Sequence, residues 1–330
     1  NKFLSMYRRE RTGVLAVLAR LCGWCILMVG CLAGTTAAAA DLVFNGGTAG
    51  NCSLSSKTYT CNGFPLTNDT DTMTIANGYT VIVNSSGVNF DYNQSLAMSG
   101  SATLNVSGNL NIGNIKPSNL AITGGNLISG GTFTIGAQAQ SITANISAVT
   151  MNLGSGSTLS ITGNISASGN VTVGSHATII GALAGAAITT NSPVVIKGNV
   201  SATSSFTLAS GSSVTGNIVA PTVSLLASQS TVNGNITART SLRLGDKVNV
   251  TGDVSTGSLL LDSSNAIIDG NATVDQATLN WAGRVTKMIY CTGGTTSGQC
   301  DCVTNNSGFP VNTDQGPHCA VAPAATPIDH

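Results

Sequence analysis

The sequence predicts an all-β fold, a single-stranded β-solenoid with about 18 residues in each coil. Glycines of a recurring motif lie at positions 216, 234, 252 and 270, with an equal step between them each time. Within each motif apolar and polar residues alternate, which is the period of a strand. The strands are short, and Gly, Asn and Ser separate them. A regular repeat of short strands and turns is typical of a β-solenoid.

Two motifs alternate along the repeat and define its extent. The first is Val214-Thr215-Gly216-Asn217-Ile218, with upstream copies around Gly198 and Gly163 and a degenerate copy at Gly181. The second is a short strand that recurs between copies of the first. Between positions 72 and 285 we expect about twelve coils, which form a rod on the order of 55 Å long at the usual spacing of strands. We expect a right-handed coil.

Each residue type in the motif has an expected place. Val, Ile, Leu and Ala face inward, where a narrow core would be overfilled by large aromatics, and the glycine lies where a tight interior leaves no room for a side chain. Stacked amide side chains form a hydrogen-bonded ladder along the rod, or else Asn is there because it suits a turn. The residues of this expected ladder, each directly after a motif glycine, are Asn164, Asn199, Asn217, Asn235, Asp253 and Asn271.

The first forty residues have the order of a secretory signal peptide. A basic stretch at positions 8–11 precedes an apolar run over 21–33, and small residues lead up to Ala40. The apolar run is too short to span a bilayer easily. An imperfect lipoprotein-type site ends at Cys31, so a lipid anchor is the alternative. We therefore expect an exported protein, at the cell surface, in the outer membrane or extracellular, with no transmembrane span after cleavage.

Charge is scarce throughout the chain. Of 330 residues only 8% are charged, with 13 basic and 13 acidic residues. Without residues 1–40 the balance is 8 basic to 12 acidic, so binding of nucleic acid through bulk electrostatics is excluded. The 42% of apolar residues argues against disorder. A stack of coils explains the scarcity, because like charges would repeat about every 4.8 Å.

Six cysteines remain after position 40, an even number that indicates disulfides in an exported protein. Two lie near the start and four near the end, which predicts disulfide-stapled caps at 41–71 and 286–319 around a solenoid over 72–285. Residues 320–330 are expected to be a linker. The first pair flanks a stretch that can close a hairpin, whereas the last four allow three pairings. Zinc is the weaker alternative, because paired C-x2-C knuckles are missing. The cysteines are Cys52, Cys61, Cys291, Cys300, Cys302 and Cys319.

The sequence predicts no catalytic, cofactor-binding or metal site. Enzymes on β-helices need clustered carboxylates or basic groups, and no Asp or Glu occurs between Asp91 and Asp246. The one acidic cluster, Asp253, Asp262, Asp269 and Asp275 with Asp246 nearby, could meet on adjacent coils and bind a cation. If the first three of these lay together beside a groove, they would favour carbohydrate chemistry. The alternative is that they are solvated turn residues. Over the same stretch, between Asp91 and Asp246, the residues that can be cationic are Lys116, His176, Lys197, Arg239 and Arg243.

The terminal segments carry a family resemblance. Residues 40–46, 277–284, 298–306 and 316–319, with Cys291, resemble the N-terminal part of MshQ-like exported proteins, which are linked to biogenesis of MSHA-type (type IV) pili. The resemblance implies cell-envelope or pilus proteins as partners and β-rich domains after residue 330. The regular coils also resemble bactofilins, polymer-forming cytoskeletal proteins that lack a cleaved signal and disulfides.

These observations lead to three hypotheses about function. The first is a non-catalytic, exported stalk or surface module of a pilus-biogenesis or adhesin-like protein, with envelope proteins or surface glycans as partners. The second is a β-helix that binds or acts on carbohydrate. The third is a scaffold that assembles through the ends of its solenoid, as bactofilins do.

Overall fold

A computed structural model describes residues 39–136, 138–154, 158–226, 228–262, 264–292 and 302–314. The expected signal peptide lies outside these ranges except for its last two positions, and so do Cys31 and residues 320–330. The described residues from Ala40 onward form one compact unit. None of the helical segments in the described ranges is both long and apolar enough to cross a membrane.

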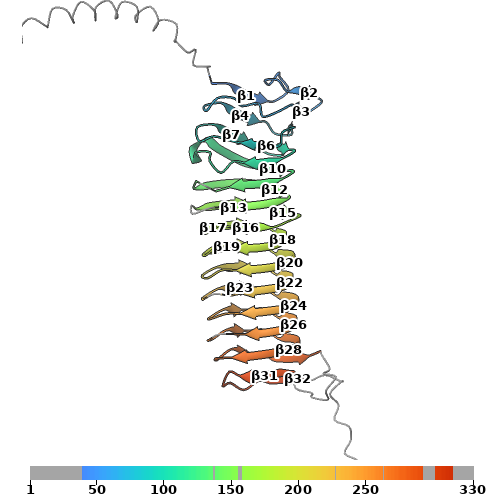
Figure 1. Cartoon of the computed structure of the whole chain (residues 1–330), viewed down its shortest axis with the longest axis vertical. Helices are drawn as coiled ribbons and strands as arrows, with labels where there is room; N and C mark the ends of the chain where they lie inside the picture. Colours follow the sequence, from blue (N-terminus) through green and yellow to red (C-terminus); the bar gives the residue numbers. More distant parts are fainter. Residues whose placement is uncertain are drawn as a thin grey trace, which may run out of the picture. The chain divides into compact units, whose positions relative to one another are not determined.

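The expected β-solenoid is confirmed, with about 13 turns of about 18 residues each. The short strands run from β1 (Asp41–Phe44) to β32 (Asn312–Asp314) and lie one above the other in chain order along a single axis (Figure 1). The pairings between described strands are parallel, except in the hairpin of β2 (Ser53–Ser55) and β3 (Thr58–Cys61). The hand of the coil stays a prediction.

The strands of the coils form three parallel stacks, which we name faces A, B and C, and the first described coil has no strand in face C. Face A contains β1, β4 (Thr72–Ile75), β7 (Ser95–Met98), the first parts of β10 (Leu120–Ser129) and β12 (Gln140–Ala148), β14 (Leu159–Thr162), β17 (Ala177–Ile180), β19 (Val194–Lys197), β21 (Ser213–Thr215), β23 (Thr231–Asn233), β25 (Asn249–Val250), β27 (Ile267–Ile268) and β29 (Arg284–Val285).

Face B contains β3, β5 (Thr80–Val83), β8 (Thr103–Val106), the second parts of β10 and β12, β15 (Ile165–Ala167), the first parts of β18 (Leu183–Thr190), β20 (Val200–Leu208), β22 (Ile218–Leu225), β24 (Ile236–Leu244), β26 (Val254–Leu261) and β28 (Ala272–Asn280), then β30 (Met288–Cys291) and β32. Face C contains β6 (Gly87–Asn89), β9 (Asn109–Asn111), β11 (Thr132–Ile135), β13 (Thr150–Leu153), β16 (Val171–Val173), the second parts of β18, β20, β22, β24, β26 and β28, and β31 (Val303–Asn306).

The coil length changes along the rod. Thr80 pairs with Thr103, whereas Ile218 pairs with Ile236, so an early coil is longer than a late one. The extra residues of the early coils lie in their connections, one of which holds the 3-10 helix η1 (Pro117–Asn119). Strand pairing also crosses both expected cap borders, since β3 stacks on β5 and β30 stacks on β28. The division at 71 and 285 therefore stays a prediction.

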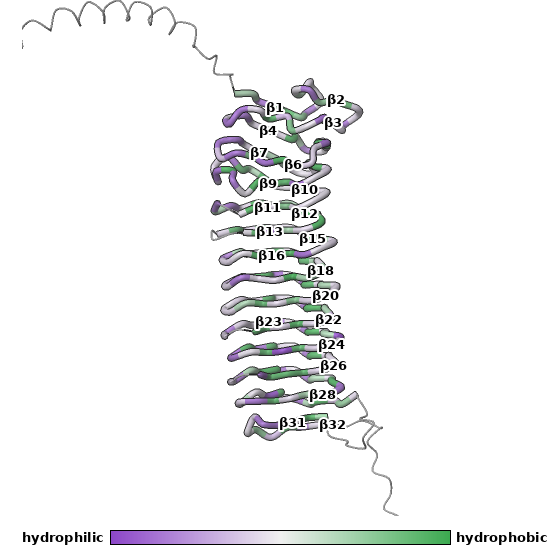
Figure 2. The backbone as a smooth tube through the Cα atoms, viewed as in Figure 1, coloured by the Kyte–Doolittle hydropathy of each residue, from purple (hydrophilic) through white to green (hydrophobic). Residues whose placement is uncertain are grey.

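Alternate residues of the strands form one continuous apolar core. In β12 every second residue is buried, from Gln140 to Ala148, and Figure 2 shows hydrophobic and hydrophilic stretches alternating along the coils. The expectation that the core excludes large aromatics is wrong: Phe133 and Phe206 are fully buried in coils of the shorter kind. The core of these coils therefore accepts an aromatic ring beside its aliphatic residues.

The motif glycines do lack room for a side chain, but for a different reason from the one expected. Gly216 is at the corner between faces A and B and not in the interior. A Cβ atom on Gly216 would overlap the backbone carbonyl of Gly198, one coil earlier, and Gly234 meets Gly216 in the same way. Gly216 also has a φ of +147°, which residues with a side chain rarely adopt. Close backbone stacking at this corner therefore requires glycine.

Candidate functional site

The expected ladder residues lie beside these glycines and join successive coils. The side-chain Oδ1 of Asn199 accepts the backbone N–H of Asn217, and Asn217 does the same for Asn235, both at 2.9 Å. Asp253 replaces an amide without a break, because only the oxygen is used, and it accepts the N–H of Asn271 at 2.8 Å. In each of these bonds a backbone N–H donates to the side-chain oxygen of the preceding coil. Asn145 and Asn164 accept in the same way and extend the ladder upstream.

The ladder has one gap. The position after Asn164 in the column is Ala182, whose N–H Asn164 accepts at 3.0 Å. Ala182 has no side-chain oxygen to offer, and within the described ranges no hydrogen bond is made by the backbone N–H of the exposed Asn199. An interrupted ladder in an intact rod indicates that the rungs stabilise the corner without being needed for the fold.

Two disulfides lie near the two ends of the described rod. Cys52 and Cys61 close the β2–β3 hairpin with their Cα atoms 4.2 Å apart, and Cys291 is bonded to Cys302, which joins β30 to the residue before β31. Cys300 and Cys319 lie outside the described residues. Each bond ties together segments next to a terminal coil, where unpaired strand edges would otherwise fray.

The acidic residues near the far end do not come together. Asp253 belongs to the ladder, Asp262 pairs with Arg243, and Asp275 accepts the hydroxyl of Thr292 at 2.6 Å. No group of three or more potential metal ligands occurs in the described part of the chain. The condition that would have favoured a cation site or carbohydrate chemistry at these carboxylates is therefore not met.

A different feature forms along the corner between faces B and C. Ala238 and Ser241 of β24 pair with Ala220 and Thr222 of β22, and with Thr256 and Ser258 of β26. Between these paired positions β24 therefore has one residue more than either neighbouring strand. β20 likewise has one more than β22. These one-residue bulges make the corners of β20 and β24 protrude. The short corner of β22, at Pro221, is recessed between them, and that of β26, at Gly257, is recessed beside β24 and has the same length as the corner of β28.

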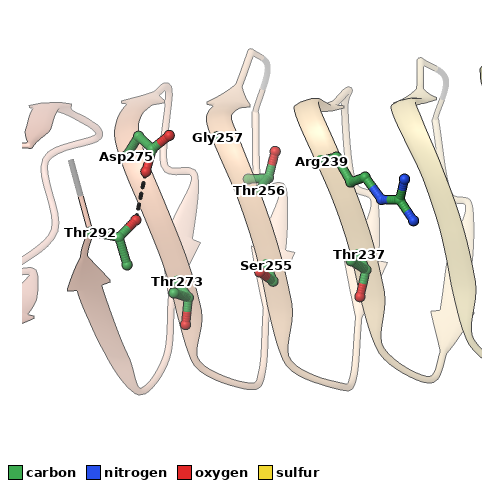
Figure 3. A pocket seen from close by; sticks show the side chains of 8 residues that line it. All are labelled: Thr237, Arg239, Ser255, Thr256, Gly257, Thr273, Asp275 and Thr292. Carbon is green, nitrogen blue, oxygen red and sulfur yellow. Dashed lines mark hydrogen bonds between the residues drawn. The ribbon is translucent and has the colours of Figure 1, made fainter.

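Two pockets occupy these recesses, and we call them together the corner groove. One has a volume of about 310 Å³ around Gly257, and the other has about 180 Å³ around Pro221. Arg239, on the bulge of β24, lines both pockets. In Figure 3 Thr237, Ser255 and Thr273 follow one another on three successive coils, and Arg239 points away from Gly257 and Asp275. The larger pocket is lined by hydroxyls, one cation and one carboxylate.

The sequence contained a signal for the corner groove that was not used. The second motif recurs at Phe206, Val223, Leu242 and Leu259, with a short step, a long step and again a short step between them. The first motif keeps a constant step over the same coils. The extra residue of a long step and the missing residue of a short step must therefore lie between faces B and C. Arg239 lies in the long step.

The terminal coils have strand edges without a described partner. β1 pairs only with β4, and β29 pairs only with β27. Ala40 and Phe44 accept the N–H groups of Thr72 and Ala76. In a parallel ladder the residues between them direct their backbone groups the other way, so Asp41 and Val43 have theirs at the open edge. The hairpin β2–β3 covers the neighbouring edge of face B.

Asp71 anchors this first coil. Its buried carboxylate accepts the backbone N–H groups of Ala40, Thr67 and Asn68 at 2.7–2.8 Å, and the side chain of Asn68 adds a fourth bond. Burial by itself raises the pKa of Asp71, but these hydrogen bonds outweigh it and lower the pKa to about 2. A charged Asp71 thus joins the residue before β1 to the start of β4.

Comparison with known families gives one match. The family described as "Bactofilin: Polymer-forming cytoskeletal" matches residues 194–273, which run from the first residue of β19 into β28. No curated protein matches the chain significantly. Comparison with solved structures likewise gives no significant match. None of these results supports the resemblance to MshQ-like proteins. Over its most regular coils the chain is similar to bactofilins, and both terminal regions lie outside the match.

Proposed function

We propose that this protein is a non-catalytic scaffold whose β-solenoid associates with further copies of itself. The observation that carries the proposal is the bactofilin match over residues 194–273, a family described as polymer-forming. The open edge of β1 supplies a surface for such association. Unpaired N–H and C=O groups at a sheet edge pair readily with another chain.

A pair of matched variants tests association through this edge. Val43 on β1 and Val219 on β22 are valines of almost equal exposure, 39% and 38%. Lysine on an edge strand opposes edge-to-edge pairing. We expect the purified chain to form oligomers that grow with concentration in sedimentation velocity and electron microscopy. Val43→Lys should shorten them, and Val219→Lys, in the middle of the rod, should not.

Other outcomes have clear meanings. A chain that stays monomeric at all concentrations, with and without reductant, would contradict self-association. Oligomers unchanged by Val43→Lys would show that the edge of β1 is not the contact. Reductant belongs in the test because the Cys52–Cys61 bond holds the hairpin that covers the edge beside β1.

The second candidate is an exported stalk or surface module that acts with envelope or pilus proteins. The two disulfides favour it, because such bonds form and persist in oxidising compartments. Cell fractionation with protease added to intact cells tests the location. Digestion of the chain in intact cells supports the surface proposal, whereas protection together with free thiols at Cys52 and Cys61 contradicts it.

A further inference from the structure

The corner groove has the shape of a lateral binding site and does not belong to the ends of the rod. Its two pockets extend from Ser201 on β20 to Thr292 after β30. Five coil-to-coil steps separate these strands, which corresponds to about 24 Å at the usual strand spacing. A ligand that filled it would be elongated along the rod and longer than one sugar or one amino acid.

The walls of the groove supply polar groups that have no partners of their own. Arg239 is exposed and makes no hydrogen bond or ion pair with any described residue, unlike Arg243 on the same strand, which pairs with Asp262. Asp275 uses Oδ1 to accept the hydroxyl of Thr292, and no described residue donates to its Oδ2. One cation and one free carboxylate oxygen therefore lie at different places along the same groove.

Gly257 keeps the floor between these groups open. A Cβ atom at this position would lie 3.0 Å from the carbonyl oxygen of Thr240 and 3.4 Å from Oδ2 of Asp275. A methyl group would thus reach van der Waals contact with the free oxygen of the carboxylate, and a larger side chain would fill the floor. The hydroxyls of Thr237, Ser255 and Thr273 flank the floor, in register on successive coils.

We propose that the corner groove binds an acidic oligosaccharide. The Arg239 guanidinium binds the carboxylate of a uronic acid unit, in the planar two-point geometry that suits this pair. The hydroxyl row and Oδ2 of Asp275 hydrogen-bond to the hydroxyls of neighbouring units. This inference does not depend on the proposed self-association, because the groove is on the side of the rod.

The groove chemistry argues against other elongated ligands. A peptide docks by strand addition or into apolar pockets, but β24 is already paired with both β22 and β26, and the larger pocket is lined only by Thr, Ser, Gly, Arg and Asp. A phosphate in the larger pocket would carry nearly two negative charges on one group beside Asp275. In an oligosaccharide with one carboxylate on each unit, the carboxylate at Arg239 is paired and those of the other units can face solvent, while the hydroxyls meet the hydroxyl row.

Calorimetric titration of the whole purified chain with a galacturonate hexamer tests the proposal. We expect binding to the unmodified chain, no binding of the hexamer with its carboxylates methyl-esterified, and at least about tenfold weaker binding by Arg239→Gln. Gly257→Val should abolish binding by filling the floor. Arg243→Gln removes the same charge from the same strand outside the groove and should leave the affinity unchanged.

Three results would overturn the proposal. They are no binding by the unmodified chain at millimolar hexamer, equal binding of the esterified hexamer, and equal weakening by Arg239→Gln and Arg243→Gln. Arg239 is exposed, so its variant is expected to fold, and circular dichroism checks this. If Gly257→Val fails to fold, the comparison of the two arginine variants still decides the outcome.

Discussion

The side-chain Oδ1 of Asn217 accepts the backbone N–H of Asn235 at 2.9 Å, so a single side chain joins two coils at the corner between faces A and B. The neighbouring Gly216 and Gly234 bring the two backbones into close contact at the same corner. Glycine and asparagine are therefore two halves of one device, because one permits the close approach and the other satisfies the backbone group that the turn leaves without a strand partner.

Removal of one rung should destabilise the rod. Asn217→Ala leaves the N–H of Asn235 without its acceptor, and because this bond is exposed we expect the free energy of unfolding to fall by about 0.5–1.5 kcal/mol in urea denaturation. Asn217→Asp should cost less, since Asp253 already serves as a rung in the same column. Asn152→Ala, at an exposed asparagine for which the structure describes no side-chain hydrogen bond, is the control. Equal losses in Asn217→Ala and Asn152→Ala would contradict the role of the ladder.

Repair of the gap should stabilise the rod. Ala182→Asn places an oxygen one coil before the N–H of Asn199, in register with the other rungs. We expect a gain of about 0.5–1.5 kcal/mol, the usual net value of one hydrogen bond. Thermal unfolding followed by circular dichroism measures it. Ala182→Ser, whose hydroxyl is one atom shorter in reach, serves as the comparison, and an equal gain in both variants would argue against the rung geometry.

A side chain at a stacking glycine should be costly. Gly216→Ala adds a Cβ that overlaps the carbonyl of Gly198 and forces alanine to a φ of +147°. Backbone strain by itself costs about 1–3 kcal/mol, so we expect a clear loss of stability in denaturation. Gly47→Ala is the control, because the nearest atom to its added Cβ is 3.6 Å away. Unchanged stability of Gly216→Ala would mean that the corner can open without cost.

Asp71 should make the first coil sensitive to acid. Its pKa of about 2 in the folded protein lies below its ordinary value of 3.8, so folding favours the charged form. Its contribution to stability is fully present above about pH 4 and is lost as the pH falls toward about 2. Asp71→Asn should lower the free energy of unfolding by about 1–3 kcal/mol near neutrality and reduce the loss between about pH 4 and 2.

Unfolding of the Asp71→Asn variant in a denaturant series at several pH values measures this effect. Asp69→Asn makes the same change of charge two positions away, at an exposed position without a described hydrogen bond. The two variants should therefore differ near neutrality and approach each other at acid pH. A constant difference between them at all pH values would show that ionisation of Asp71 does not stabilise the fold.

The sequence alone determined the architecture of this protein. Glycines repeating at Gly216, Gly234 and Gly252, with apolar residues alternating around them, predict stacked coils of equal length over this stretch, because the step of the repeat and the alternation can both be read along the chain. The same pattern predicted which asparagines lie in one column. It did not tell whether their amides would bond to each other or to the backbone.

The tertiary structure decided the features that arise from contacts between successive coils. The apolar neighbours of Gly216 predict that it faces the interior, but what excludes a side chain there is the backbone carbonyl of Gly198 in the preceding coil. Phe206 is fully buried in a core that the sequence predicted to exclude large aromatics. The corner groove arises because adjacent coils differ by one residue at the same corner, which places Arg239 on a bulge and Gly257 in a recess. The spacing of the motifs along the chain reveals the extra residue. Only the pairing of stacked strands shows that the shorter corner beside it is recessed.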